Sequence, residues 1–277
     1  MPELPEVETV RRDLDRELSG RRIVRVVATG ARSLRRHPDL AQFAAAVRGA
    51  TVVSVSRRGK YLLLRLVGAA EGDRSLVVHL GMSGQLLLHA ADAALRPHTH
   101  AVLGFDDGRE LRFVDPRTFG EIFLAPPGGE ALAHLGPDPL ADLKSWNHLA
   151  DLLAVRSTKL KALLMDQRFL AGIGNIYSDE ILHRARLRWD RSAATLTPVE
   201  VRRLYRSMGE ILGAAIELRG SSLDDQQYRD VFGAIGAYQG QHRVYGREAA
   251  PCLRCRCPIV RVRTAGRSTF LCPRCQA

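Results

Sequence analysis

Short segments in which apolar and polar residues alternate, or in which apolar residues run together, fill the first half of the chain. They cover residues 22–28, 51–67, 75–89, 100–115 and 119–125. Turn sequences separate them, namely Arg58-Gly59, Ser83-Gly84 and Asp106-Asp107-Gly108. Because roughly six to eight short strands with turns between them are typical of a β-sandwich or barrel, the pattern predicts that fold for the first part of the chain.

Helical periodicity lies on both sides of the predicted strands. Apolar residues recur every three or four positions from Val7 to Leu18, behind Pro5 and Glu6, which suit the first turn of a helix. We therefore expect a helix over 3–18 and another over about 38–48. In the second half of the chain the pattern predicts helices over 157–167, 175–187 and 197–220.

A stretch rich in proline and glycine, residues 125–143, lies between the predicted strands and the C-terminal helices. We place a domain boundary there, and we expect an α+β chain of two domains, an N-terminal β-sandwich with flanking helices followed by a helical C-terminal domain. Residues 221–242 show weak periodicity and many small or polar side chains, so we predict a long, partly mobile loop.

The charge balance of the chain is strongly positive. The 277 residues include 41 Lys and Arg against 30 Asp and Glu, a formal net charge of +11. Such a balance favours a polyanionic partner, although an arginine-rich composition also arises without one. No run approaches the roughly 18 consecutive apolar residues of a membrane span, and residues 1–20 lack the apolar core of a signal peptide, so we expect a cytoplasmic protein.

Two Cys-x-x-Cys pairs near the C-terminus predict a metal site. Each pair places two thiolates in one tight turn, and two such turns complete a tetrahedral Zn²⁺ shell with no open position for a reacting water. We therefore expect one structural zinc ion on a two-stranded hairpin that turns at Ala265-Gly266, with buried thiols or disulfides as the alternative. The expected ligands are Cys252, Cys255, Cys272 and Cys275.

Cys257 is a fifth sulfur close to the first pair. It is either a small buried hydrophobe or a competitor of Cys255 as a zinc ligand, and the Cys-x-x-Cys spacing favours Cys255.

Six sequence blocks follow one another along the chain: PELPEVET at the start, GKYLL (59–63), HLGMSG (79–84), FVDPRTFG (113–120), GIGNIYSDE (172–180) and GRSTFLCPRCQ (266–276). Together they resemble the formamidopyrimidine-DNA glycosylase family over nearly the whole chain. The resemblance implies a β-sandwich, a helix–two-turn–helix domain and a zinc finger, with DNA in the cleft between the domains. It also implies a monomeric base-excision repair enzyme that removes 8-oxoguanine and formamidopyrimidines from duplex DNA and cuts the abasic strand by β,δ-elimination.

The resemblance gives names to the expected domains. They are the catalytic β-sandwich domain (1–130), a linker (131–143), the helix–two-turn–helix DNA-binding domain (144–225), a lesion-capping loop (226–248) and the zinc finger (249–277).

The family match implies a catalytic role for Pro2 once Met1 is removed. An α-amino group has a pKa of about 7.7–8.0, against about 10.4 for lysine, so much more of it is free base at neutral pH. A secondary amine that attacks C1′ yields an iminium, which acidifies the C2′ hydrogen and permits β-elimination of the 3′-phosphate. The resemblance makes Glu3 the general acid to the sugar ring oxygen. Lys60 is placed near the lesion phosphate or in proton transfer, with a solvated turn lysine as the alternative.

Glu6 has two interpretations of equal weight. It either orients the N-terminus and moves a proton, or it only complements the helix dipole.

Seven further residues are implied as DNA contacts. Met82 and Phe119 would fill the gap left by an extruded base, and Arg117 would bind the estranged cytosine, whereas ordinary core packing is the alternative for the two apolar residues. The phosphate contacts would be His79, Lys161, Asn175 and Arg267, with Asn175 also capping its helix next to the Gly172 and Gly174 N–H groups. An isolated strand histidine such as His79 is otherwise a packed core residue.

The chain departs from the family pattern at two places. Arg256 stands where the family usually has glycine after the second zinc cysteine, and the lesion-capping region reads GAIGAYQGQH. Two other functions stay open at this point: an oxidised-pyrimidine glycosylase of the endonuclease VIII branch, against which Leu4 argues, and a zinc-dependent DNA-binding module without catalysis.

Overall fold

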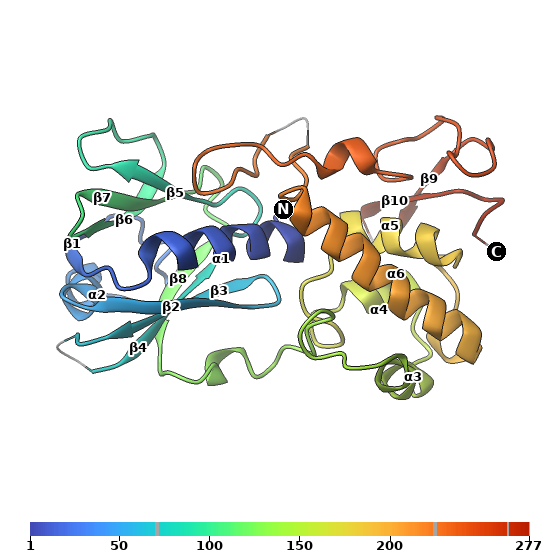
Figure 1. The fold of residues 1–277 in the computed structure, drawn as a ribbon, viewed down its shortest axis with the longest axis horizontal. Helices are drawn as coiled ribbons and strands as arrows, with labels where there is room; N and C mark the ends of the chain where they lie inside the picture. Colours follow the sequence, from blue (N-terminus) through green and yellow to red (C-terminus); the bar gives the residue numbers. More distant parts are fainter. Residues whose placement is uncertain (70–71, 224–225, 265, 277) are drawn as a thin grey trace. The chain divides into compact units, whose positions relative to one another are not determined.

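The computed structural model describes residues 1–69, 72–223, 226–264 and 266–276. The chain divides into two compact units. The N-terminal unit comprises residues 1–133 and 218–237, and the C-terminal unit comprises residues 134–217 and 238–277 (Figure 1). Residues 218–237 therefore pack with the N-terminal unit, although they follow the last long helix of the C-terminal unit.

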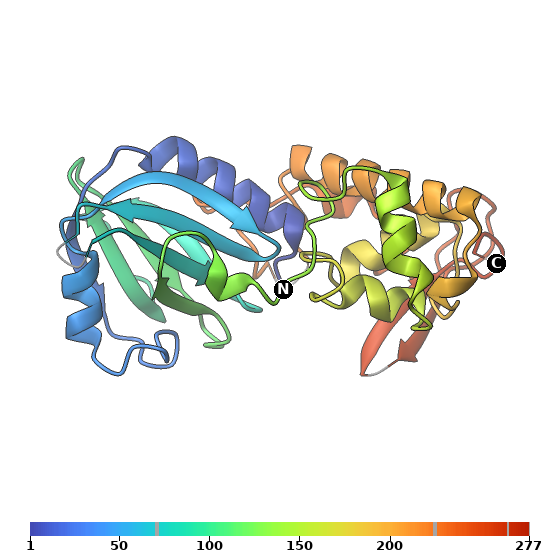
Figure 2. The same cartoon turned by 90° about the horizontal axis from the view of Figure 1, so that it is seen from below.

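The N-terminal unit contains two antiparallel sheets of four strands each, in agreement with the predicted sandwich. One sheet has the order β1 (Ile23–Ala28), β6 (Thr99–Phe105), β7 (Arg109–Val114), β5 (Gln85–Ala90). The other has the order β2 (Thr51–Arg58), β3 (Tyr61–Val67), β4 (Arg74–His79), β8 (Glu121–Ala125). The predicted turn at Arg58-Gly59 joins β2 to β3, and Figure 2 shows the strands of both sheets from below.

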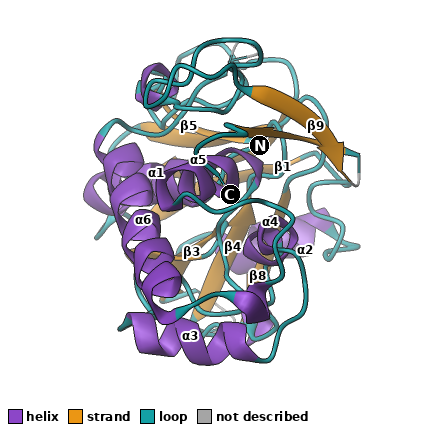
Figure 3. Ribbon diagram, turned by 90° about the vertical axis from the view of Figure 1, so that its right-hand side faces the viewer, coloured by secondary structure: helices purple, strands orange, loops and turns teal. Residues whose placement is uncertain are grey.

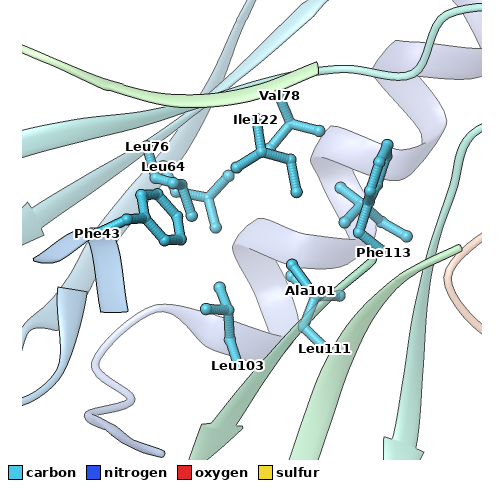
Figure 4. A pocket seen from close by; sticks show the side chains of 10 residues that line it. Phe43, Leu64, Leu76, Val78, Ala101, Leu103, Leu111, Phe113 and Ile122 are labelled. Atoms are coloured by element: carbon cyan, nitrogen blue, oxygen red, sulfur yellow. The ribbon is translucent and has the colours of Figure 1, made fainter. Parts of the chain in front are cut away.

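Apolar side chains from both sheets meet in the centre of the sandwich. Strand β3 alternates, with Leu62, Leu64 and Leu66 fully buried, as expected for a strand with one core-facing side. A cavity of about 10 Å³, about one water molecule in size, lies in this core. Figure 4 shows the apolar side chains that line it, among them Phe43, Phe113 and Ile122. Apolar walls and this small volume make the cavity a packing defect rather than a ligand site.

Two helices accompany the sandwich at the predicted places. Helix α1 (Leu4–Leu18) packs on β2, and the apolar side chains of Val7, Val10, Leu14 and Leu18 are fully buried. Helix α2 (Leu40–Val47) packs on β1 and begins at Asp39, whose side chain accepts from the N–H groups of the first turn. Both helices were thus predicted, and for α1 the pattern of apolar positions also predicted the face that it buries.

The C-terminal unit contains four helices in its described residues, shown in purple with the strands in orange in Figure 3. They are α3 (Trp146–Ala154), α4 (Leu160–Met165), α5 (Asn175–Ala185) and α6 (Pro198–Glu217). The last three were predicted, but α3 was not. Its signal was local, because the side chain of Ser145 caps the helix by accepting from the N–H of His148 at 3.2 Å.

The cysteine-rich end of the chain forms the predicted hairpin. Strands β9 (Val260–Thr264) and β10 (Arg267–Leu271) pair antiparallel. Of the predicted Ala265-Gly266 turn, Gly266 has φ +76°, which suits a tight turn, and Ala265 lies outside the described residues. Three short 3₁₀ turns, η1 (Glu130–Leu132), η2 (Ala193–Thr195) and η3 (Tyr238–Gln241), complete the regular structure of the described chain.

Among the described residues, no helix combines the length and the apolar character that a membrane crossing requires.

Candidate active site and DNA interface

The start of α1 brings together three of the predicted catalytic residues. Pro2 is buried and precedes Glu3, the N-cap residue, which is 2% exposed. The N–H of Glu3 donates to Glu6 Oε2 at 2.8 Å, and Glu6 Oε1 accepts from the N–H of Ser221 at 2.8 Å. The Glu6 carboxylate therefore contacts the backbone beside Pro2 and joins it to residues 218–237.

The backbone at Gly220 depends on the absence of a side chain. Gly220 has φ +77°, and a Cβ there would lie 2.7 Å from Glu6 Oε1. Next to it, Arg219 contacts both Asp13 of α1 and Asp230. These contacts hold the described part of segment 218–237 against α1, which is why it belongs to the N-terminal unit.

Lys60 lies in the β2–β3 turn and is 6% exposed. An arginine anchors this turn to α1, because Arg57 Nε donates to Glu8 Oε2 at 3.0 Å while Arg57 Nη1 donates to the Gly59 carbonyl at 2.9 Å. Burial raises the pKa of Glu8, but hydrogen bonds from its arginine partners outweigh burial and lower it. The Lys60 turn is thus tied by an ionised pair to the helix that begins behind Pro2.

His79 ends β4 with its ring centroid 4.6 Å from that of Tyr61, its partner on β3. Burial and then the charge of Lys60 lower the pKa of His79 to about 4. The imidazole is therefore neutral at pH 7, with one ring nitrogen that can donate a hydrogen bond and one that can accept.

Met82, Arg117 and Phe119 lie on two neighbouring connections between the sheets. Residues 80–84 connect β4 to β5, and residues 115–120 connect β7 to β8. Since β4 pairs with β8 and β5 pairs with β7, the two connections start and end on paired strands. Phe119 is 46% exposed and Met82 is 38% exposed, and the guanidinium of Arg117 lies 5.1 Å from the Phe119 ring centroid. Exposed apolar side chains beside a cation suit insertion between stacked bases.

In the C-terminal unit, the start of α5 differs from the prediction in two respects. Gly174 is the N-cap residue and Asn175 is the first helical residue, so the prediction that Asn175 caps the helix is wrong. The N–H of Gly172 donates to Gln167 Oε1 at 2.8 Å and is therefore engaged within the protein. The Asn175 Oδ1 is buried and has no hydrogen-bond partner in the described part of the chain.

Lys161 is buried rather than exposed at the DNA-binding surface. Its side chain is 6% exposed, and Nζ lies 2.8 Å from Asp179 Oδ1. Nζ also donates to the Ser268 carbonyl at 3.1 Å and to Thr269 Oγ1 at 2.9 Å. Asp179 Oδ2 in turn accepts from the N–H of Phe270 at 2.9 Å. This pair fastens β10 to α4 and α5.

Arg267 is exposed at the first position of β10. It lines a cavity of about 160 Å³ together with Lys159 and Trp189, and Lys159 Nζ lies 5.4 Å from the Trp189 ring centroid. Cations gathered around a hollow beside the hairpin suit contact with a nucleic-acid backbone.

The four predicted zinc ligands lie together, with their Sγ atoms within 4.8 Å of one another. The Cys252–Cys275 Sγ distance is 3.9 Å and the Cys255–Cys272 distance is 3.4 Å. Zn–S bonds of about 2.3 Å in a tetrahedron require sulfur atoms about 3.8 Å apart, so the site fits one Zn²⁺. Cys257 is not a member of this cluster, although its carbonyl accepts from the N–H of Cys252 at 2.9 Å.

Two neighbours complete the surroundings of the zinc site. Arg256 has φ +66°, the left-handed region that glycine adopts without strain and a residue with a Cβ adopts at a cost. His183 is buried, and its Nε2 lies 3.6 Å from Cys252 Sγ. A zinc-bound thiolate carries no hydrogen, so this imidazole nitrogen must donate to the sulfur.

Sequence analysis missed the residues that hold the site together. Asp115 joins two connections of the sandwich, and Asp179 and Glu180 both bind backbone N–H groups near the zinc hairpin. All three lie inside the quoted motifs FVDPRTFG and GIGNIYSDE, so the available signal was an acid embedded in an otherwise apolar or small-residue block. Their partners are distant in sequence, and only the tertiary fold identifies them.

Comparison with protein families covers nearly the whole chain. Residues 1–122 match the formamidopyrimidine-DNA glycosylase N-terminal domain, residues 135–227 match the H2TH domain of the same enzymes, and residues 250–277 match the zinc finger found in FPG and IleRS.

Curated relatives and solved structures agree with these matches. Formamidopyrimidine-DNA glycosylases of Symbiobacterium thermophilum and Thermus thermophilus are 46% and 45% identical, over 100% of this chain and 89% and 98% of theirs. The structure of the MutM (FPG) protein from Thermus thermophilus matches with a TM-score of 0.87 at 43% identity, over 99% of this chain and 98% of that one. Lactococcus lactis Fpg, solved with DNA that contains an abasic site, matches with a TM-score of 0.89 at 33% identity, over 99% of both chains.

Proposed function

The chain belongs to the formamidopyrimidine-DNA glycosylase family, and from this premise we propose that it excises oxidised purines from duplex DNA and cleaves the resulting abasic strand. The observation that carries the proposal is the buried Pro2 directly ahead of α1, with Glu3 and Glu6 beside it. Its substrates are 8-oxoguanine and formamidopyrimidines, and its partner is the DNA duplex that contains them. It acts as a monomer in the compartment that holds the genome, because the substrate is there.

The proposed reaction starts from the free secondary amine of Pro2 after Met1 is removed. The nitrogen attacks C1′ as the bond from C1′ to the damaged base breaks, and the base leaves with a proton. Glu3 donates a proton to the sugar ring oxygen, the ring opens, and the amine and C1′ form an iminium. Glu6, bound to the N–H of Glu3, keeps this segment in place.

Strand cleavage then follows from the iminium as an electron sink. Loss of the C2′ proton breaks the bond from C3′ to the 3′-phosphate, and a second elimination releases the 5′-phosphate. The buried Lys60, fixed to α1 through Arg57, is proposed to assist at the lesion phosphate or in proton transfer.

Insertion into the duplex is proposed for Met82, Arg117 and Phe119. Extrusion of a base costs a few kcal/mol of stacking and pairing, and side chains that fill the gap recover part of it. Two of these side chains are apolar and more than a third exposed, and the guanidinium of Arg117 lies beside the Phe119 ring. Arg117 is proposed to donate to the acceptors of the unpaired cytosine.

Phosphate contacts are proposed for His79, Asn175 and Arg267, whereas Lys161 is proposed to have a structural role. Because its Nζ is already bound to Asp179, Ser268 and Thr269, we assign it to holding β10, which begins with Arg267. The zinc ion, held by the four cysteines, stabilises the hairpin from its other end, and a full thiolate shell leaves it no catalytic position.

Borohydride trapping on a duplex with one 8-oxoguanine opposite cytosine tests the proposal. We expect a covalent adduct that peptide mass mapping assigns to Pro2, with Met1 absent. Pro2→Gly is expected to abolish strand cleavage. Pro5→Ala, a matched proline substitution in the first turn of α1, is expected to keep it.

Three results would overturn the proposal. Full strand cleavage by Pro2→Gly would exclude the proline mechanism. Tight binding of the same duplex without any adduct would favour a binding module. Faster excision of thymine glycol than of 8-oxoguanine would favour the endonuclease VIII type of activity.

A further inference from the structure

A single buried carboxylate joins the two connections that carry Met82, Arg117 and Phe119. Asp115 is fully buried. Its Oδ1 accepts from the Ser83 hydroxyl at 2.5 Å and from the N–H of Arg117 at 3.3 Å. Its Oδ2 accepts from the N–H of Gly120 at 2.7 Å. One side chain thus binds the residue after Met82 and the residues on both sides of the segment 118–119.

Asp115 is itself held on the sheet by its main chain. Its N–H donates to the His98 carbonyl at 3.0 Å, and its own carbonyl accepts from the N–H of Thr118 at 3.2 Å. The same carbonyl lies 2.9 Å from His100 Nε2. The carboxylate therefore projects from a fixed point of the β7–β8 connection.

The two connections also touch through their backbones. Gly81 has φ +63°, and a Cβ there would lie 2.5 Å from the Gly120 nitrogen and 2.5 Å from the Phe119 carbonyl carbon. No side chain fits between the two connections at this point. Beside this backbone contact, the Ser83 hydroxyl joins the two connections through its hydrogen bond to Asp115. Ser83 Oγ also accepts from the N–H of Arg117 at 3.3 Å.

The partners of this carboxylate are a hydroxyl and N–H groups rather than a cation. A buried charge is costly unless its lone pairs are satisfied, and here both oxygens accept hydrogen bonds from protein groups. What a carboxylate adds is a fixed geometry for two separate turns.

We propose that Asp115 is a positioning residue that holds Met82, Arg117 and Phe119 in one arrangement before DNA binds. The inference rests on the proposed function, in which these three side chains replace an extruded base. Side chains that are ordered in advance lose less conformational freedom on binding, so more of their contact energy supports extrusion. Asp115 then contributes most where a stacked and paired base must be displaced, and least where the base is already missing.

Asp115→Asn tests this assignment, because its amide group turns one acceptor into a donor that faces the N–H of Gly120 or the Ser83 hydroxyl. We expect single-turnover excision of 8-oxoguanine opposite cytosine to fall roughly tenfold or more. Strand cleavage at a preformed abasic site should fall much less. Ser83→Ala should shift the ratio of the two rates in the same direction. In the double variant the excision rate should fall by less than the product of the two single-variant fold reductions.

Asp138→Asn is the matched control. Asp138 is also buried, and its Oδ1 accepts from the N–H groups of Leu140 and Ala141 at 3.0 and 3.2 Å in a turn of the C-terminal unit. It is expected to change both rates by the same factor. Thermal unfolding of each variant separates a loss of fold from a loss of positioning, and Ser83→Ala carries the test if Asp115→Asn does not fold.

An equal fall of the two rates in Asp115→Asn, or an unchanged rate on the paired lesion, would overturn the assignment. The proposed function fails separately, because that failure is seen in the wild-type protein as absence of excision and of a trapped adduct.

Discussion

His79 shows how burial sets the state of a single residue before any ligand is present. Burial and the Lys60 charge lower its pKa to about 4, from an ordinary value of 6.5. Between these values the unfolded chain binds a proton that the folded chain excludes. The stability supplied by the neutral ring is therefore complete above pH 6.5 and is lost as the pH falls towards 4.

His79→Gln should remove this pH dependence. We expect the fall in the free energy of unfolding between about pH 6.5 and 5 to become less steep by up to about 1.4 kcal/mol per pH unit. Urea unfolding at about pH 7, 6 and 5 measures the slope. His98→Asn is a suitable control in the same unit, since His98 is exposed and has φ +63°, which asparagine tolerates. Equal slopes in wild type and His79→Gln would contradict the assignment.

At the scale of elements, α5 is the support of the zinc hairpin. Asp179 binds the N–H of Phe270, and the Glu180 carboxylate accepts from the N–H groups of residues 243–245 at 2.8–3.0 Å. One turn further along, His183 contacts Cys252. A single helix thus binds the hairpin, the segment that leads to it and one zinc ligand.

Removal of the His183 N–H that donates to Cys252 should weaken zinc binding. A hydrogen bond to a zinc thiolate lowers the charge on sulfur and fixes the ligand, and loss of such support typically costs about 10- to 100-fold in metal affinity. We expect His183→Phe to release zinc to a chromophoric chelator about tenfold faster, with His183→Gln, which keeps an N–H donor, in between. Zinc release from His183→Phe at the wild-type rate would show that the contact between His183 and Cys252 does not contribute to zinc binding.

At the scale of the whole molecule, the charge of +11 predicts binding to DNA that weakens steeply with salt. Arg267→Ala should reduce the slope of log K against log salt by about one and weaken lesion and undamaged duplexes alike. Fluorescence anisotropy over a salt series measures both effects.

Arg261→Ala provides the control on the same hairpin. Arg261 lies 3.5 Å from Glu248 and 5.9 Å from the Phe270 ring centroid, so its charge is partly used within the protein. Arg261→Ala removes the same charge as Arg267→Ala but should change the slope of log K against log salt less. If the two variants behave alike, Arg267 has no specific phosphate contact.

The organisation into elements was predictable where a pattern repeats over several turns or strands. The burial of α1 along one face and the alternation in β3 follow directly from residue spacing. Helix α3 was missed because its local signals are few, namely the Ser145 cap and two buried apolar positions, Leu149 and Leu153. The partners of residues 218–237 were missed because the signal for packing against α1 lies in Asp13 and Glu6, which are distant in sequence from Arg219 and Ser221.

The sequence by itself determined the four zinc ligands, because Cys-x-x-Cys spacing places two thiolates in one turn, whereas the residues proposed for the reaction and for insertion into DNA came from the resemblance to the family. Only the tertiary structure decided that Lys161 is buried beneath the hairpin, that Gly174 rather than Asn175 caps α5, and that Asp115 joins two turns. The physical reason is that hydrogen bonds and ion pairs between distant segments depend on atomic positions, and these exist only once the strands and helices have packed.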